Sequence, residues 1–269
     1  MTKQLAKFIA DLNQLDKHHI GYCGEKEEDI LHDIQEIKPY FITYEYEGEI
    51  EAAIGLDIDE ADRSAEVWGP FAKNHEVKKD LWNQVVNSYE NKLQQLSFFV
   101  NEKNNSTLHF LQSIDATHQG NHAILAAKRG IFQNICHSYH EQYRNDFLLL
   151  HEATFPQTYL SGEEILKLLD QHHKLLLLTE NGQLQGYVYL EAAPHFGEGQ
   201  IEFLAVCPKA RKKGRGRQLI EAALETLFQY ENIDKITLCV SLDNHQAIKL
   251  YQSAGFELSA RLKLFSYQF

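Results

Sequence analysis

Long apolar stretches are missing from this sequence of 269 residues. A membrane-spanning helix needs roughly 18 or more consecutive apolar residues, and no run approaches that length. The first residues, MTKQLAKFIADLNQLDK, form a charged amphipathic pattern without the apolar block and cleavage site of a signal peptide. We therefore expect a cytoplasmic protein that does not associate with membranes.

Cysteines are few and lie far apart. Cys23, Cys136, Cys207 and Cys239 form no CxxC pair, which argues against a disulfide framework and against a cysteine zinc site. The 14 histidines include no HxH or HExxH arrangement. We expect reduced thiols and no metal cofactor.

Basic residues are also in deficit. The chain holds 26 Lys and Arg against 38 Asp and Glu, and residues 1–130 carry most of this imbalance, with 13 basic and 22 acidic side chains. General affinity for nucleic acid needs many cations that neutralise phosphates, so we expect no nucleic-acid partner. The acidic character is compatible with a cationic or amine substrate.

The second half of the chain alternates predicted strands and helices. Two apolar runs around the turn at 180–183 predict a hairpin, and two later stripes at helical spacing predict helices. The predicted elements are strands 175–179, 184–192 and 199–206, helix 219–228, strand 235–241, helix 247–254, and a closing hairpin or pair of strands at 256–269. The nearly apolar strand 235–241 is expected to be buried on both faces.

Capping residues support these helices. Asn244 is placed to cap the start of the second helix, and Gly255 is placed to end it. Ser161 to Glu164 forms a capping box that opens a further helix.

The first half of the chain repeats the same order more faintly. Its predicted elements are a strand, turn and strand within 40–56, strand 64–71, helix 77–93, strand 96–100, helix 105–114 and strand 122–128. A repeat with a period of roughly 130 residues indicates duplication rather than a solenoid. We predict an α/β (α+β) fold with two tandem domains, 1–130 and 131–269, each a mixed, mostly antiparallel twisted sheet flanked by helices.

One segment runs against the acidic composition. Six of the 26 basic side chains lie between Lys209 and Arg217, after a predicted strand and before a predicted helix, and two glycines interrupt them. Glycines let a backbone approach a ligand closely, and the N–H groups at a helix start bind anionic oxygens. The RxxGxG form at 211–216 therefore favours a phosphate-binding loop. A solvated basic turn and a short RNA or targeting patch are the alternatives.

The motifs around this loop point to one family. A Walker loop would need GxxxxGK[ST], and a dinucleotide loop would need a third glycine where Leu219 stands. The pattern that fits is LAVxPxxRxxGxG at 204–216, followed by NxxAxxLYxxxGF at 244–256. With their strand and helix context across residues 174–260, these motifs resemble the GNAT family of acyl-CoA-dependent N-acetyltransferases. The resemblance implies two tandem GNAT-like domains.

The resemblance implies acetyl-CoA as the cofactor and coenzyme A as the product. It implies that the pyrophosphate is held by the loop residues Arg211, Lys212, Lys213, Gly214, Arg215, Gly216 and Arg217. It implies that the pantetheine arm pairs, like an added strand, with Phe203, Leu204, Ala205 and Val206. Asn244 then corresponds to the asparagine that contacts the cofactor, and Tyr251 to the tyrosine near the thioester sulfur.

The reaction explains why these residue types are needed. An alkylamine has a pKa of roughly 10 and must lose a proton before it attacks a thioester. Glu202 is the candidate base, because period-two alternation puts it on one face with Gln200, Leu204 and Val206. The N–H of Leu204 would stabilise the negative oxygen, and the Tyr251 phenol would protonate the leaving thiolate without a covalent enzyme intermediate. A core aromatic at Tyr251 and a solvent-facing strand residue at Glu202 are the alternatives.

The first half resembles a GNAT domain without its cofactor loop. No glycine occurs between Gly69 and the predicted helix at 77, and the later segment NNSTLHFLQSIDA has His109 before Phe110 where the second half has Leu250 before Tyr251. Asn104 or Asn105 would match the capping asparagine of the second half. We predict a degenerate domain without acetyl-CoA.

The leading hypothesis is an acetyl-CoA-dependent N-acetyltransferase with catalysis in residues 131–269 and a small-molecule or peptide amine as acceptor. A non-catalytic acyl-CoA-binding or interaction module is the alternative. A nucleic-acid-binding protein that uses the basic loop is a weaker one, because the rest of the chain is acidic. The sequence identifies neither the acceptor nor the oligomeric state.

Overall fold

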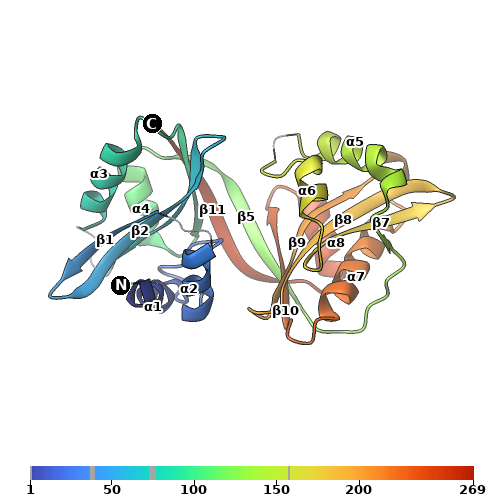
Figure 1. Ribbon diagram of the computed structural model, residues 1–269, viewed down its shortest axis with the longest axis horizontal. Helices are drawn as coiled ribbons and strands as arrows, with labels where there is room; N and C mark the ends of the chain where they lie inside the picture. Colours follow the sequence, from blue (N-terminus) through green and yellow to red (C-terminus); the bar gives the residue numbers. More distant parts are fainter. Residues whose placement is uncertain (1, 37–39, 73–76, 157) are drawn as a thin grey trace. The chain divides into compact units, whose positions relative to one another are not determined.

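The computed structural model describes residues 2–36, 40–72, 77–156 and 158–269 (Figure 1). The chain forms two compact units. Unit 1 comprises Met1–His122 and Ala260–Phe269, and unit 2 comprises Ala123–Ser259. These units differ from the predicted domains 1–130 and 131–269, because residues 123–130 belong to unit 2 and residues 260–269 belong to unit 1.

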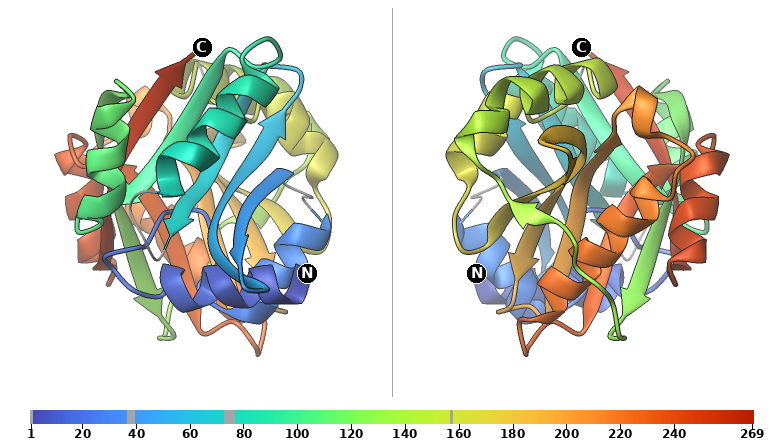
Figure 2. Two further views of the ribbon diagram at one scale, coloured as in Figure 1. Left: turned by 90° about the vertical axis from the view of Figure 1, so that its left-hand side faces the viewer. Right: turned by 90° about the vertical axis from the view of Figure 1, so that its right-hand side faces the viewer.

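Unit 1 is a mixed sheet with helices on both faces (Figure 2, left). Its strands follow the order β1-β2-β3-β4-β11, with a parallel pairing of β3 with β4. Helices α3 and α4 cover one face, and α1 and α2 cover the other. The elements are α1 (Thr2–Asn13), α2 (Glu27–Glu36), β1 (Tyr40–Tyr46), β2 (Glu49–Asp59), β3 (Ser64–Ala72), α3 (Val77–Tyr89), β4 (Gln95–Asn101), α4 (Asn105–Ser113) and the start of β5 (Thr117–Lys128).

Unit 2 has the same kind of sheet, in the order β5-β10-β9-β8-β7-β6. Helix α7 lies against β7, β8 and β9 (Figure 2, right), and α5 and α6 cover the opposite face. The elements are β6 (His137–Ser138), η1 (Glu141–Tyr143), α5 (Arg144–Thr154), α6 (Gly162–Leu168), β7 (His173–Glu180), β8 (Gln183–Ala193), β9 (Glu198–Val206), η2 (Pro208–Ala210), α7 (Arg215–Phe228), β10 (Lys235–Ser241), α8 (His245–Ser253) and β11 (Glu257–Gln268).

Alternation explains why the central strands of unit 2 are so apolar. On β7, Leu175 and Leu177 face α5 and α6, whereas Leu176 and Leu178 face α7. Both faces of β7 are therefore covered by a core, so consecutive positions from Leu175 to Leu178 require apolar side chains.

Most predicted elements and caps are confirmed. The Asn244 side chain accepts a hydrogen bond from the Ala247 N–H at 3.1 Å, Gly255 follows α8 with a φ of +95°, and Ser161 forms its capping box. Helices α1 and α2 were not predicted as elements.

Two expectations about strands are wrong. The closing segment is the single strand β11 rather than a hairpin or a strand pair. Strand β10 alternates buried and half-buried positions, so only one of its faces is fully covered.

Strands β5 and β11 pass from one unit to the other, which explains the displaced domain boundary. Strand β11 pairs with β4 from Leu262 opposite Asn101 to Gln268 opposite Gln95, and its Phe265 lies in the core of unit 1. In return, alternate residues 123, 125 and 127 of β5 lie in the core of unit 2. Each unit is thus completed by a strand from the other half of the sequence.

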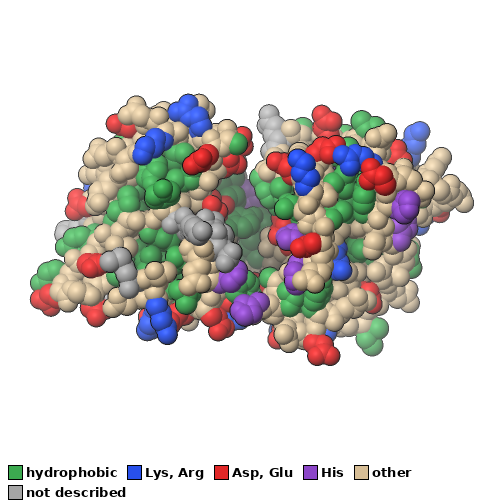
Figure 3. All heavy atoms as spheres, viewed as in Figure 1, with side chains coloured by type: hydrophobic (Ala, Val, Ile, Leu, Met, Phe, Trp, Pro, Cys, Tyr) green, Lys and Arg blue, Asp and Glu red, His purple; other side chains and the backbone are tan. Residues whose placement is uncertain are grey.

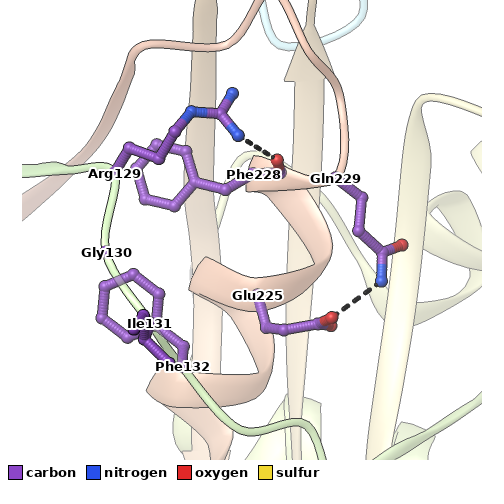
Figure 4. Close-up of a pocket in the computed structure, with 7 residues that line it drawn as sticks. All are labelled: Arg129, Gly130, Ile131, Phe132, Glu225, Phe228 and Gln229. Carbon is purple, nitrogen blue, oxygen red and sulfur yellow. Dashed lines mark hydrogen bonds between the residues drawn. The ribbon is translucent and has the colours of Figure 1, made fainter.

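Arg129 ties the end of β5 to the C-terminal end of α7 (Figure 4). Its guanidinium donates to four backbone carbonyls, those of Phe228 at 2.6 Å, Tyr230 at 2.9 Å, Glu231 at 3.1 Å and Ile233 at 2.7 Å. These carbonyls lie at or just beyond the C-terminal end of α7, where the positive charge complements the negative end of the helix dipole. A surface pocket of about 300 Å³ lies beside Arg129, at the opposite end of α7 from the basic loop.

The strand exchange can be tested through the two tryptophans, Trp68 and Trp82, which both lie in unit 1. Phe265 is only 8% exposed, so we expect Phe265→Ala to lower the stability of unit 1 by about 3 kcal/mol because of lost burial and a cavity. Urea unfolding followed by tryptophan fluorescence should show an earlier midpoint. The control is Leu258→Ala, at a 47% exposed position of β11 in unit 2, and an unchanged midpoint for Phe265→Ala contradicts the exchange.

Candidate functional site

Strand β9 has one open edge in its second half. It pairs with β8 along its whole length, from Glu198 opposite Ala193 to Val206 opposite Gly186. On the other side it pairs with β10 only from Glu198 to Gln200. The edge of β9 from residue 201 to residue 206 therefore has backbone groups that no described strand satisfies.

The direction of these groups follows from one hydrogen bond. The Cys207 N–H donates to the carbonyl of Gln185 on β8, at 2.8 Å. Because N–H groups alternate along an extended strand, those of Leu204 and Val206 point to the opposite, open edge. The strand can thus accept an extended polar chain as an added partner.

The basic loop connects this strand to α7 through two left-handed residues. Lys212 has a φ of +60° and Gly214 a φ of +77°. Gly214 is the N-cap of α7, and no side chain caps this end of the helix. Within the described chain, the first N–H groups of α7 are therefore available to an anion, and the helix dipole favours a negative charge there.

The basic side chains of the loop are partly neutralised by neighbours. The Arg215 guanidinium contacts Glu180 at 2.5 Å, and that of Arg217 contacts Glu221 at 2.8 Å. The Arg211 Nε donates to the Val206 carbonyl at 3.1 Å. Lys209, Arg211, Lys212 and Lys213 are exposed, and no salt bridge pairs them with an acidic side chain among the described residues.

Helix α8 lies against the same core as α7 but buries no residue completely. Asn244 uses its Oδ1 to cap this helix, which leaves its Nδ2 as a donor. Tyr251 is half-buried with its ring 5.8 Å from that of Phe256. Burial raises the pKa of Tyr251 to about 12, so the phenol keeps its proton throughout the physiological range.

Glu202 does not share a face with Leu204 and Val206, contrary to the expectation from period-two alternation. Strand β9 pairs with β8 so that Glu202 has no opposite residue. This extra residue is a β-bulge, which resets the alternation. Phe203 therefore faces α5 and α6, on the side of Glu202, whereas Leu204 and Val206 face α7.

Burial controls the charge of Glu202. It raises the pKa of this carboxyl to about 7, with a further contribution from the nearby Glu191 carboxylate, while a hydrogen bond from the Tyr159 hydroxyl opposes the shift. A group with a pKa near 7 can both take up and release a proton at neutral pH, as general-base catalysis requires.

Sequence analysis missed Tyr159 as the partner of Glu202. The two residues are 43 positions apart, and no spacing rule connects them. The carbonyl of the next residue, Leu160, accepts a hydrogen bond of 2.9 Å from the Nε2–H of buried His151. The Nδ1 of His151 then accepts a hydrogen bond from the Tyr187 hydroxyl at 2.5 Å, so this histidine holds the segment that carries Tyr159.

In unit 1, two parallel strands also pair over only a few residues, but a buried lysine side chain lies in the region beyond the pairing. Strand β3 pairs with β4 only from Ser64 to Glu66. The second residue of α3 is Lys78, which is 2% exposed and donates to Ser106 at 2.6 Å and Thr107 at 3.1 Å, at the start of α4. Burial lowers the pKa of Lys78 to about 8.

The corresponding position in unit 2 is the second residue of α7, Gly216. A Cβ there would come within 2.7 Å of the Leu250 side chain on α8. At this helical position unit 1 thus carries a buried lysine stem, whereas in unit 2 the Leu250 side chain packs directly against the glycine. Asn104 caps α4 through the Thr107 N–H, as Asn244 caps α8. Part of the predicted glycine-free loop, residues 73–76, lies outside the described residues.

On the face of the chain visible in Figure 3, acidic and basic side chains are interspersed. Among the residues that the structure describes, no helix is both long and apolar enough to span a membrane. The same residues contain no group of three His, Cys, Asp or Glu side chains arranged for a metal ion.

Comparisons with known proteins agree with the geometry. Residues 132–256 match the profile of the Acetyltransferase (GNAT) family. A mycothiol acetyltransferase of Renibacterium salmoninarum is 36% identical over 30% of this chain and 25% of its own length. A spermidine N(1)-acetyltransferase of Vibrio cholerae is 28% identical over 38% of this chain and 62% of its own length. The chain spans about a quarter of the length of the mycothiol acetyltransferases that it matches.

Two solved structures share the fold of the chain. A GCN5-related N-acetyltransferase from Sphaerobacter thermophilus superposes with a TM-score of 0.78 at 14% identity, over 98% of this chain and 91% of its own. A tandem GNAT protein from the clavulanic acid biosynthesis pathway gives 0.69 at 12% identity, over 99% of this chain and 94% of its own. Residues 132–256 therefore match the GNAT family model, and the chain over almost its whole length shares the α/β fold of these solved structures, in agreement with the resemblance found in the sequence.

The raised pKa of Glu202 predicts a pH-dependent stability. The folded-state pKa of about 7 exceeds the ordinary value of 4.5, so the folded protein holds this proton more tightly than the unfolded chain does. The carboxyl therefore costs stability as the pH rises through this interval. Relative to wild type, Glu202→Gln should gain up to about 3 kcal/mol of unfolding free energy between about pH 5 and about pH 8.

Urea unfolding at a series of pH values measures this gain. Glu152→Gln, which removes an exposed carboxylate from α5, is the control and should show a constant difference from wild type. A constant difference for Glu202→Gln as well would show that Glu202 ionises normally.

Proposed function

We propose that unit 2 is an acetyl-CoA-dependent N-acetyltransferase that acts on a primary amine of a small molecule or peptide. One observation carries this proposal: the open edge of β9 leads directly into the uncapped N-terminus of α7. An extended amide-containing arm can pair with such an edge while a pyrophosphate sits at such a helix end. Coenzyme A has these two parts in this order.

The cofactor residues follow from this placement. The backbone of β9 would pair with the pantetheine arm at Phe203, Leu204, Ala205 and Val206. The loop N–H groups and basic side chains would hold the phosphates at Arg211, Lys212, Lys213, Gly214, Arg215, Gly216 and Arg217. Asn244 and Tyr251 would contact the arm from α8, whose incompletely buried face offers apolar surface for a ligand to cover.

The residues around the reacting atoms provide acid–base catalysis. Acetyl-CoA supplies the acetyl group as a thioester. Glu202 takes the proton that the amine nitrogen loses as the new N–C bond forms. The Leu204 N–H, which points into the open edge, stabilises the negative charge on the acyl oxygen. Tyr251 gives its proton to the sulfur as the C–S bond breaks and recovers one from solvent.

We further propose that unit 1 binds no acetyl-CoA. It has the strand divergence, but the Lys78 side chain fills the space between α3 and α4. In agreement, α4 buries Thr107, Leu108, Phe110 and Leu111, whereas α8 buries no residue completely. Unit 1 would then serve as a structural partner of the catalytic unit.

A non-catalytic acyl-CoA-binding or interaction module is the alternative function. It would use the same open edge and loop but would need no titrating carboxylate. The raised pKa of Glu202 favours the enzyme, because ionising a buried carboxyl group costs stability that a binding module has no reason to give up.

Substitution of the two proposed catalytic residues tests the reaction. With saturating acetyl-CoA and an accepted amine, Glu202→Gln should lower kcat/KM by about 100-fold and remove the ionisation near pH 7 that limits the wild type on its acidic side. Tyr251→Phe should lower kcat by about tenfold or more with unchanged affinity for acetyl-CoA. Release of free thiol measures turnover.

The exposed Glu152→Gln variant is again the control and should keep full activity. Unchanged turnover in the Glu202→Gln, Tyr251→Phe double variant would refute this mechanism. Tight binding of acetyl-CoA without transfer to any of a broad panel of amines would favour the non-catalytic module.

A further inference from the structure

Two carboxylates face the same side of the sheet near the bulge of β9. Glu191 on β8 lies opposite Gln200, two residues before Glu202. Residues in such a diagonal relation have their Cβ atoms roughly 7–8 Å apart. Neither carboxylate forms a salt bridge with a described lysine or arginine, and burial raises the pKa of both.

The neighbouring titratable groups do not neutralise this pair. Asp170 adds a third carboxylate nearby, but it is occupied by the backbone N–H groups of His172 and His173 at 2.7 Å each and by the His173 ring at 2.9 Å. His173 lies opposite Glu191 on β7 and is shared with Asp170. No described lysine or arginine therefore neutralises Glu191 and Glu202 when they ionise.

A buried phenol beside these carboxylates is poorly hydrogen-bonded. Tyr189 is 0% exposed, and its hydroxyl makes no hydrogen bond of ordinary geometry with any described residue. Burial raises its pKa most, followed by the charge of Glu191 and a weak hydrogen bond with that carboxylate, so the hydroxyl lies next to Glu191. A buried polar group without a partner costs about 1–3 kcal/mol, and a ligand that binds here can recover this cost.

An exposed aromatic ring borders the carboxylates. Tyr159 is 68% exposed, yet its position is set, because its ring lies 5.4 Å from that of Phe203 and its hydroxyl donates to Glu202. An ammonium group is attracted both to carboxylates and to the face of an aromatic ring. Carboxylates, a poorly hydrogen-bonded hydroxyl and aromatic rings together are the chemistry that recognises an alkylammonium ion.

We propose that Glu191, Tyr189 and Tyr159 form a subsite for a cationic group, so that the acceptor is a diamine or a similar amine with a second positive charge. This inference rests on the proposed function of unit 2. One nitrogen of the acceptor loses its proton to Glu202 and is acetylated, while the other stays protonated at Glu191. A free carboxylate on the acceptor would be repelled by the same pair, so α-amino acids should be poor acceptors.

The test compares diaminopentane with pentylamine, which has the same carbon chain and one charge fewer. Wild type should show a kcat/KM about tenfold or more higher for the diamine, since a charge-assisted hydrogen bond is lost in the monoamine. Glu191→Gln should lose most of this preference, measured as the ratio of the two kcat/KM values in the same variant, and keep its affinity for acetyl-CoA. Glu152→Gln should keep the preference.

Direct binding separates this proposal from the proposed activity. Calorimetry of each amine with the full chain needs no turnover, and diaminopentane should bind about tenfold more tightly than pentylamine to wild type. Tyr189→Phe should weaken the binding of the diamine with little effect on the stability of the free protein, because its hydroxyl makes no hydrogen bond of ordinary geometry there. If diaminopentane binds selectively but neither amine is acetylated, the proposed subsite is supported and the proposed enzyme activity is refuted.

Equal binding of the two amines overturns the subsite, even if both are acetylated. A preference that survives in Glu191→Gln also overturns it. If Glu191→Gln fails to fold, the Tyr189→Phe result decides between the two outcomes.

Discussion

The departure of β9 from β10 is the constraint on which the proposed site depends. The two strands pair over only three residues, while β8 holds β9 in place along its full length. The open edge is therefore rigid, and its N–H groups are aimed before any ligand arrives. Because the proposed contacts with the cofactor come from backbone groups, many different side chains along β9 and the loop are compatible with cofactor binding. The bulge at Glu202 belongs to the same distortion, since it turns one carboxylate toward α5 and α6 just where the edge opens.

Much of unit 2 could be predicted because its signals are local. Alternating leucines define β7, a four-residue turn defines the hairpin, and Asn244 and Gly255 bracket α8. The basic loop was also predictable from the sequence, because glycines among basic residues between a strand and a helix are typical of a phosphate-binding loop. The bulge was not predictable, because one extra residue in β9 leaves no trace in composition but reverses the face of every residue after it.

Long-range features were missed for a different reason. The link between Tyr159 and Glu202 joins a connecting segment to a strand, and the exchange of β5 and β11 depends on which sheet edge each strand meets. Both are decided by tertiary packing rather than by sequence spacing. The two units differ in this way at one helical position. Lys78 in α3 extends its own side chain to the next helix, whereas Gly216 in α7 lets the Leu250 side chain of the next helix approach its backbone.

A calorimetric titration with acetyl-CoA tests the central claim, that the backbone of β9 and its loop forms the cofactor site of the chain. We expect one acetyl-CoA per chain, with affinity reduced tenfold or more in Gly214→Val, because a β-branched residue disfavours the φ of +77° that the loop needs. Gly182→Val imposes the same strain at φ +74° in the turn between β7 and β8 and should bind normally. Two molecules per chain would show that unit 1 keeps a site, and no binding would contradict the account.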